Sequence, residues 1–186
     1  MFDHFALFAP FYDRLMGPPD AARLAALLKL PTPGWLLDGG GGTGRTAQPL
    51  RAMVGNLVVS DISQRMLAEA RRKRLPAARA RAERLPFADG CFERALVVDA
   101  LHHFGDPAGA IGELSRVLRP GGRLLVEEFD ASRPAVRLLA AAEKLALMRS
   151  RFFTPGEVGR MMTAAGLAAH TRTDGGMTAW IVGDKP

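Results

Sequence analysis

Four consecutive glycines follow a short apolar segment that ends in aspartate, and this run constrains the fold more than any other feature. Residues 34–38 read GWLLD, positions 39–42 are all glycine, and Thr43 and Gly44 complete the run. Glycine is favoured where the backbone needs positive φ or must approach a ligand closely, because a Cβ would collide there. Residues 45–53 then show a helical pattern. The sequence therefore predicts a strand, a ligand-binding glycine loop and a helix in this order.

Short apolar runs alternate with helical patterns along the remaining chain, which indicates an α/β domain with a mostly parallel sheet. The expected strands are 34–38, 57–61, a weak edge strand within 76–84, 94–99, 123–129, 167–173 and 177–182. The expected helices are 45–53, 63–74, 107–118, 134–148 and 154–166. No linker or repeat divides residues 1–186, so we expect a single domain, with an N-terminal helical segment at 1–30 and an α/β core at 31–186.

The composition excludes several classes of protein. The chain has 186 residues, 48% hydrophobic and 24% charged, which suits one globular core and excludes a disordered chain. Cys91 is its only cysteine, so no internal disulfide and no multi-cysteine metal site can form, and no metal is expected. Apolar runs are shorter than the roughly 18 residues of a membrane span, and the start does not resemble a signal peptide. We expect a cytoplasmic protein.

The net charge of +6 raises the question of nucleic-acid binding. The densest basic patch comprises Arg71, Arg72, Lys73, Arg74, Arg79, Arg81 and Arg84. No aromatic residue is interleaved with these side chains, as a base-stacking surface would need. We therefore interpret the patch as a solvated helix end, and nucleic acid is not an expected partner.

Asp61 ends the second expected strand, 17 positions after Gly44. A carboxylate at this place can accept hydrogen bonds from both hydroxyls of a ribose, so the pattern predicts a site for a nucleoside-containing ligand. The other interpretation is that Asp61 caps the next helix and the glycines only form a turn. Two registers fit the run: Gly39, Gly41 and Gly44 match the dinucleotide pattern, whereas Gly40, Gly42 and Gly44 match a D-x-G-x-G-x-G pattern.

The chain lacks the characteristic residues of two other classes of nucleotide-binding protein, the short-chain dehydrogenases and the P-loop proteins. The only tyrosine is Tyr12, ahead of the expected core, so the tyrosine–lysine pair of short-chain dehydrogenases is missing. No G-K-[ST] follows the glycines, so the chain has no P-loop.

Four ordered motifs resemble class I S-adenosylmethionine-dependent methyltransferases. They are LLDGGGGTG at 36–44, VVSDISQRML at 58–67, AERLPFADGCFERALVVDALHHFGDP at 82–107 and ELSRVLRPGGRLLVEEF at 113–129. The segment FALFAPFYDRLMG at 5–17 is similar to the opening of the ubiquinone/menaquinone-type C-methyltransferases. The resemblance covers nearly the whole chain. It implies a Rossmann-like seven-stranded sheet with six parallel strands and an antiparallel C-terminal strand, and helices on both faces.

The resemblance also implies S-adenosylmethionine as the cofactor and assigns residues to it. The glycine loop, with Gly39 at its start and Gly40, Gly42 and Gly44 as its motif positions, would hold the methionine part. Asp38 would order the ammonium group of that part, and Asp61 would bind the ribose.

For the adenine, the resemblance implies packing on Ile62 and a backbone contact from Ala82. The family usually has Asp or Asn just before this alanine, whereas this chain has Arg81. Arginine offers no acceptor to the adenine amino group. Either the backbone recognises the adenine, or Glu83 supplies the missing acceptor, or the cofactor binds weakly.

Three residues at the end of the fourth expected strand and just after it are candidates for catalysis. Asp99 ends that strand and is expected near the transferring methyl group, and His102 and His103 follow it. A neutral imidazole can take a proton from the acceptor. The other interpretation is that one histidine orients the loop by hydrogen bonding while the other packs. Glu127 and Glu128 alternate faces at the end of the next expected strand, so one of them can face the site.

The first 12 residues contain Phe2, Phe5, Phe8, Phe11 and Tyr12, a spacing close to a helical stripe. Such a stripe either belongs to the core or forms a lid over the cofactor, with Tyr12 in contact with it.

Three functions remain open on these observations. The first is methyl transfer to a small-molecule carbon or oxygen nucleophile of an aromatic or quinone-like kind. The second is a non-catalytic protein that binds S-adenosylmethionine or S-adenosylhomocysteine, and the third is a dinucleotide-binding protein that uses the other glycine register. The acceptor's identity and the oligomeric state are not encoded in any motif of the chain.

Overall fold

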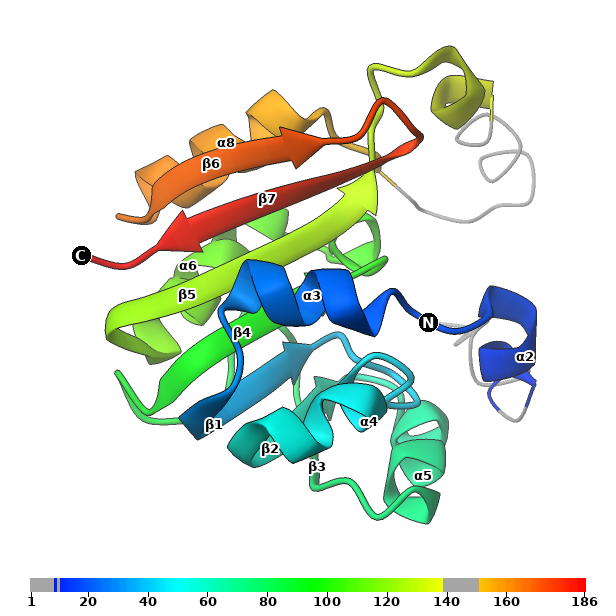
Figure 1. Cartoon of the computed structure of the whole chain (residues 1–186), viewed down its shortest axis with the longest axis vertical. Coiled ribbons are helices and arrows are strands. Elements are labelled where there is room, and N and C mark those ends of the chain that lie inside the picture. The colour runs from blue at the N-terminus through cyan, green and yellow to red at the C-terminus, as the bar shows by residue number, and fades with distance from the viewer. Residues whose placement is uncertain (1–8, 10, 139–150) are drawn as a thin grey trace.

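A seven-stranded sheet forms the centre of the molecule, in the order β3-β2-β1-β4-β5-β7-β6 (Figure 1). The computed structural model describes residues 9, 11–138 and 151–186. The strands are β1 Thr32–Gly39, β2 Val54–Asp61, β3 Ala77–Arg79, β4 Phe92–Val98, β5 Leu118–Phe129, β6 Ala168–Thr173 and β7 Thr178–Asp184. Only β7 runs antiparallel to its neighbours, β5 and β6, which confirms the predicted sheet.

Helices cover both faces of this sheet (Figure 1). One face carries α3 Ala21–Leu28, α4 Ala47–Leu50 and α5 Gln64–Arg72, and the other carries α6 Pro107–Val117 and α8 Pro155–Ala164. The short helix α2, Tyr12–Met16, lies beyond the end of the sheet toward which β1 points. Residues 1–8 and 10 lie outside the described residues. Of the aromatic stripe, only Phe11 and Tyr12 can therefore be placed.

Alternating strand residues divide the buried side chains into two cores. Leu36 of β1 packs with Leu24 and Leu28 of α3, whereas Leu37 packs with Leu114 of α6 on the opposite face. All five side chains are fully buried. The parallel strands are therefore buried on both faces, and the polar groups of the fold concentrate at the strand ends.

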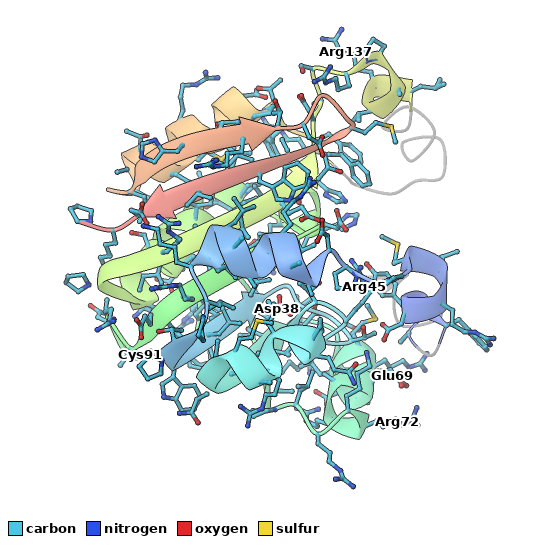
Figure 2. The ribbon with its side chains drawn as sticks, viewed as in Figure 1. Asp38, Arg45, Glu69, Arg72, Cys91 and Arg137 are labelled. Atoms are coloured by element: carbon cyan, nitrogen blue, oxygen red, sulfur yellow. The ribbon has the colours of Figure 1, made fainter. Side chains whose placement is uncertain are left out.

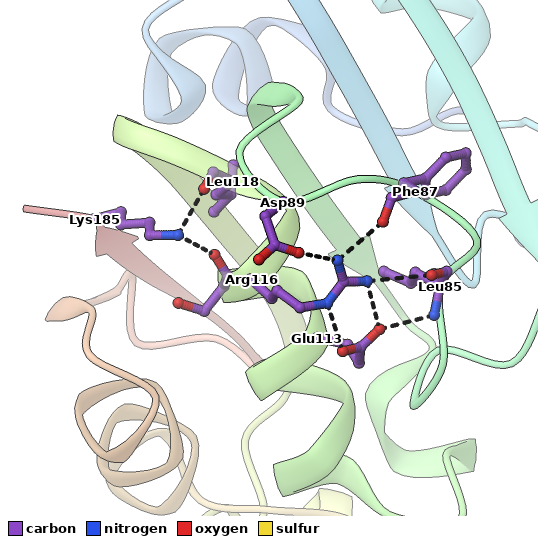
Figure 3. A network of polar contacts seen from close by, with 8 residues as sticks. Leu85, Phe87, Asp89, Glu113, Arg116, Leu118 and Lys185 are labelled. Carbon is purple, nitrogen blue, oxygen red and sulfur yellow. Dashed lines mark hydrogen bonds and ion pairs between the residues drawn. The ribbon is translucent and has the colours of Figure 1, made fainter.

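The segment after β3 is a loop fixed by one arginine (Figure 3). The Arg116 guanidinium on α6 donates to the carbonyl oxygens of Leu85 and Phe87, at 3.2 and 2.9 Å. It also binds the carboxylates of Glu113 and Asp89, at 2.8 and 2.5 Å. These contacts hold the loop against α6 and satisfy carbonyl groups that no strand pairs.

Two of the predicted helices begin with a capping side chain. The Ser63 side chain accepts a hydrogen bond from the Met66 N–H at the start of α5. Thr154 and Glu157 form the complete capping box of α8.

Three predicted boundaries differ from the structure. The helix expected over 45–53 consists of α4 and a 3-10 turn, Arg51–Met53. Strand β5 begins at Leu118, five residues earlier than predicted, because Leu118 already pairs with Phe92 before an irregularity in the register. Of the helix expected over 134–148, residues 134–138 are helical and the rest lies outside the described residues.

Candidate functional site

The predicted site residues converge at the carboxyl ends of β1, β2 and β4. Asp38 and Gly39 end β1, Asp61 ends β2, and Asp99 follows β4. The strand order reverses between β1 and β4, because the chain adds β2 and β3 on one side and β4 and β5 on the other. Ligands of open α/β sheets bind at such a reversal, so the topology and the motifs indicate the same place.

The backbone distinguishes the two glycine registers. Gly40, Gly42 and Gly44 have φ of 71°, 53° and 72°, whereas Gly39 and Gly41 do not adopt positive φ. Residues with a Cβ rarely adopt such angles. The positions whose φ favours glycine are therefore those of the D-x-G-x-G-x-G pattern, and Gly39 completes β1.

Asp38 is a buried carboxylate without a well-formed hydrogen bond. Its side chain is 1% exposed, and neither of its oxygens has a partner among the described residues. Burial, with a further contribution from Asp61, raises the pKa of Asp38 to about 7, although Arg45 and the Ala47 N–H oppose the shift. A Cβ on Gly41 would lie 2.3 Å from the Asp38 Cγ, so only glycine leaves room for this carboxylate. A buried acid of this kind suits a cationic ligand group.

Asp61 connects the end of β2 to the glycine loop. Its Oδ2 accepts from the Gly42 N–H at 3.0 Å, and its Oδ1 accepts from the Ser63 N–H at 2.7 Å. The interpretation of Asp61 as a local cap is thus correct in part, because the Ser63 contact opens the turn before α5. Each carboxylate oxygen has two lone pairs, so these contacts leave acceptor capacity for a ligand hydroxyl.

Arg45 follows the glycine loop (Figure 2), and its guanidinium lies beside the Asp99 carboxylate. Its Nη2 is 3.4 Å from the Asp99 Oδ2, and its Nη1 donates to the Gly17 carbonyl oxygen at 3.1 Å. Burial raises the pKa of Asp99, with Glu128 adding to the shift while Arg45 and His102 oppose it. Asp99 itself has a φ of 51°, an unusual backbone conformation for a residue other than glycine.

Tyr12 on α2 belongs to the same cluster. Burial raises its pKa, while the charge of Arg45 lowers it and the charges of Asp99, Asp61 and Asp13 raise it further. The predicted lid residue is therefore close enough to the loop for its charges to act on the phenol.

An ionic contact joins α2 to the glycine loop and to the end of α5. The Thr43 hydroxyl donates to the Asp13 Oδ1 at 2.5 Å, and Lys73 forms an ion pair with the other Asp13 oxygen. The Lys73 ammonium also donates to the Thr43 carbonyl oxygen at 2.9 Å. Three segments far apart in the sequence thus meet at Thr43, and we refer to Asp13, Thr43 and Lys73 as the loop clasp.

The predicted adenine residues follow β2 and β3, the strands next to β1 on one side of the sheet. Ile62 is 53% exposed, so its apolar side chain is accessible to a ligand. Ala82 lies in a turn closed by a bridge between Arg81 and Arg84. The Glu83 carboxylate accepts from the Asp106 N–H at 3.1 Å and pairs with Arg81. Glu83 is therefore already engaged by the loop at Asp106.

His102 is buried and paired with Glu128. Its Nδ1 is 2.6 Å from the Glu128 Oε2, and both side chains are 4% exposed. The Glu128 Oε1 accepts from the N–H of Leu101 at 2.6 Å and from that of His102 at 3.3 Å, and the imidazole stacks on Phe152. Glu128, and not Glu127, is thus the carboxylate that faces this loop; Glu127 accepts from the Trp180 indole N–H at 2.6 Å.

His103 is a poor proton acceptor. Burial lowers its pKa to about 3, and the neighbouring His102 contributes in the same direction. A group with so low a pKa remains neutral and binds a proton weakly near neutral pH. Of the two histidines, His102 is the better candidate for a base.

The motifs alone do not reveal the roles of Arg45, Asp13, Lys73 and Glu128. Arg45 directly follows the glycine run, which is the one signal that marks it. The partners of the other three are distant in sequence, by 26 to 60 positions.

Comparison with known proteins gives the class of this fold and site. A family model described as "Methyltransferase domain" matches residues 37–126. The demethylmenaquinone methyltransferase of Mycolicibacterium paratuberculosis is 38% identical over 115 residues, which cover 62% of this chain and 49% of that protein. The corresponding enzyme of Corynebacterium kroppenstedtii is 36% identical over 121 residues, covering 64% and 52%. The chain spans about half the length of these curated relatives.

Solved structures share the fold. A SAM-dependent methyltransferase from Thermotoga maritima has a TM-score of 0.76 at 24% identity and covers 96% of this chain and 98% of its own. A second, from Aquifex aeolicus, has a TM-score of 0.78 at 18% identity, with complete coverage of both chains.

Residues 37–126 therefore match a methyltransferase domain, and the solved structures that share the fold include SAM-dependent methyltransferases. Within this class the matched sequence is similar to demethylmenaquinone methyltransferases, as the opening segment at 5–17 had indicated.

Two further observations concern the described residues only. None of their helices is both long and apolar enough to cross a membrane. They contain no cluster of three or more His, Cys, Asp and Glu residues suited to a metal ion.

Proposed function

We propose that this chain transfers the methyl group of S-adenosylmethionine to a small-molecule carbon or oxygen nucleophile of an aromatic or quinone-like kind. The observation that carries the proposal is the buried, unpaired carboxylate of Asp38 beside the glycine loop, which suits the cationic end of this cofactor. The acceptor class is supported by the similarity to demethylmenaquinone methyltransferases over 62% of the chain.

In this proposal the carboxyl edge of the sheet orders the cofactor. Asp38 binds the ammonium group, and the loop at Gly40, Gly42 and Gly44 lies against the methionine part. Asp61 accepts hydrogen bonds from the ribose hydroxyls while it keeps its contacts with the Gly42 and Ser63 N–H groups.

The adenine would pack on the exposed side chain of Ile62 and bind the backbone at Ala82. Glu83 is engaged by Asp106 and Arg81, so we assign adenine recognition to the backbone. Backbone recognition needs no Asp or Asn at the position of Arg81, which accounts for that departure from the family pattern.

The sulfonium of the bound cofactor activates its own methyl group, so the protein mainly aligns the acceptor and excludes water. A nucleophile that arrives protonated needs a base as well. With its Nδ1–H donated to Glu128, the neutral His102 ring has its lone pair on Nε2, where it can accept the acceptor's proton. Asp99 lies beside it and lines the same end of β4.

The direct test incubates the purified protein with S-adenosylmethionine labelled in the methyl group and a panel of hydroquinones, phenols and thiols. We expect label in a hydroquinone or phenol product, and nuclear magnetic resonance would show whether carbon or oxygen carries it. Saturable cofactor binding without transfer to any acceptor would favour the non-catalytic binding protein. Binding of NAD in place of S-adenosylmethionine would favour the dinucleotide register.

Asp61→Ala tests the ribose assignment. We expect S-adenosylmethionine binding to weaken by about 1.5 to 3 kcal/mol, because hydrogen bonds to a charged group are lost. Isothermal titration calorimetry measures this loss, with Asp174→Ala as the control, since Asp174 is an exposed carboxylate that binds Arg23. An unchanged dissociation constant would remove Asp61 from the site.

Glu128→Gln tests the base. The amide oxygen can still accept from Leu101, whereas an NH₂ group facing His102 favours the tautomer with its lone pair on Nδ1. We expect kcat to fall roughly 100-fold, the usual scale for losing a general base, with cofactor affinity retained. His103→Gln serves as the control and should change kcat little. Equal kcat values for Glu128→Gln and the parent protein would contradict a proton-transfer role for His102.

A further inference from the structure

Arg45 is a mostly buried cation with more N–H donors than described hydrogen bonds. Only 11% of its side chain is exposed, and its two described hydrogen bonds are those to Gly17 and Asp99. The Asp99 contact, at 3.4 Å, is long for a charge-assisted hydrogen bond, which is normally about 2.7–2.9 Å. A guanidinium has five N–H donors, so Arg45 keeps donors for a further partner.

The surroundings of Arg45 are acidic. Its charge lowers the pKa of Asp38, Asp99 and Glu127, each of which burial raises. It is the one cation that acts on all three of these carboxyl groups among the described residues. These three carboxyl groups therefore share one cation among the described residues, Arg45.

The methionine end of S-adenosylmethionine has two opposite charges on one carbon, an ammonium and a carboxylate. Asp38 suits the ammonium, and a carboxylate placed beside Asp38 would meet repulsion from every other acid of the cluster. Among the described residues, Arg45 is the cation that acts on these acids, and its planar fork matches a carboxylate with two parallel hydrogen bonds.

We infer that Arg45 binds the carboxylate of the cofactor's methionine part and thereby makes the site selective for cofactors that have this group. The inference rests on the cofactor assignment above and adds a residue to it. The Arg45 N–H groups that now make only the long contact with Asp99 would donate to the ligand carboxylate. Arg45 would keep its hydrogen bond to the Gly17 carbonyl oxygen.

The test compares two ligands that differ only in the carboxylate: S-adenosylmethionine and decarboxylated S-adenosylmethionine. Calorimetry would measure both for the parent protein, Arg45→Ala and Arg45→Lys. We expect Arg45→Ala to bind S-adenosylmethionine roughly 10- to 100-fold more weakly and the decarboxylated ligand with unchanged affinity. Arg45→Lys keeps the charge without the fork and should fall between the two.

Binding of 5′-methylthioadenosine, which has no amino acid part, shows whether the adenosine side of the site is intact in each variant. Equal losses of affinity for S-adenosylmethionine and its decarboxylated form would show that Arg45 acts only through the glycine loop. A loss of methylthioadenosine binding in the variants would show the same. No loss for S-adenosylmethionine would also overturn the inference. A parent protein that binds none of the three ligands would instead overturn the cofactor assignment, so the two failures are distinguishable.

Discussion

Asp38→Asn is expected to stabilise the ligand-free protein at about pH 8 and to weaken cofactor binding at the same pH. The pKa of Asp38 rises from 3.8 to about 7 in the folded state, chiefly through burial. The folded state therefore binds this proton more tightly than the unfolded state does. Its contribution to stability is present below about pH 4 and is lost as the pH rises to about 7.

Above about pH 7 the buried, ionised Asp38 destabilises the folded protein, and asparagine removes this charge. A shift of this size corresponds to about 4 kcal/mol at most. The buried amide of the variant costs about 1 to 2 kcal/mol of its own. We therefore expect a net gain of about 1 to 3 kcal/mol in the free energy of unfolding near pH 8, and little or none near pH 5.

Cofactor binding should change in the opposite direction. The ammonium group of the cofactor favours ionised Asp38, so the affinity of the parent protein should rise about fivefold from pH 6 to pH 7. The variant should lack this rise and bind roughly 10- to 100-fold more weakly near pH 7.5.

Urea unfolding at several pH values and calorimetry on the same samples measure both effects. The difference in unfolding free energy between variant and parent isolates Asp38 from all other titrating groups. A difference that does not grow with pH, or a variant that binds the cofactor as tightly as the parent, would contradict the assignment of Asp38 to the ammonium group.

Removal of residues 1–16 is expected to abolish turnover and leave a folded α/β core. The deletion takes away Tyr12, which lies near Arg45 and Asp99, and Asp13, whose carboxylate binds Thr43 and Lys73 in the loop clasp. Helix α2 has no buried residue, and Ala9 is the one buried residue in the described part of this segment, so the core should depend little on it. We propose that this segment is a lid that orders the glycine loop and excludes water from the methyl group.

Circular dichroism should show the secondary structure retained, and a methyl-transfer assay should show activity lost. Lys73→Met provides a milder version, because it removes only the contacts of Lys73 with Asp13 and Thr43 and keeps the chain length. It should weaken cofactor binding severalfold and make it less sensitive to salt. Undiminished turnover of the truncated protein would contradict the lid.

The sheet and the cofactor edge could be predicted because local patterns determine them. Apolar runs mark the buried strands, and the glycines, Asp38 and Asp61 occupy the ends of adjacent strands, which the topology brings together. The edge position of β3 and the capping box at Thr154 also follow from local signals.

The remaining site depends on contacts between distant segments. The pairing of His102 with Glu128 requires β4 and β5 to be neighbours in register, which spacing alone does not specify. The loop clasp unites residues 13, 43 and 73 from three elements. The choice between the glycine registers depends on φ angles, and a run of identical residues contains no information about them.

The central claim is tested most directly by titrating the protein with S-adenosylmethionine and S-adenosylhomocysteine in a calorimeter, with NAD as the control. The account predicts saturable micromolar binding of the first two at one site per chain, and none of NAD. Absence of binding by both sulfur compounds, or binding of NAD alone, would contradict the assignment of this glycine loop to S-adenosylmethionine.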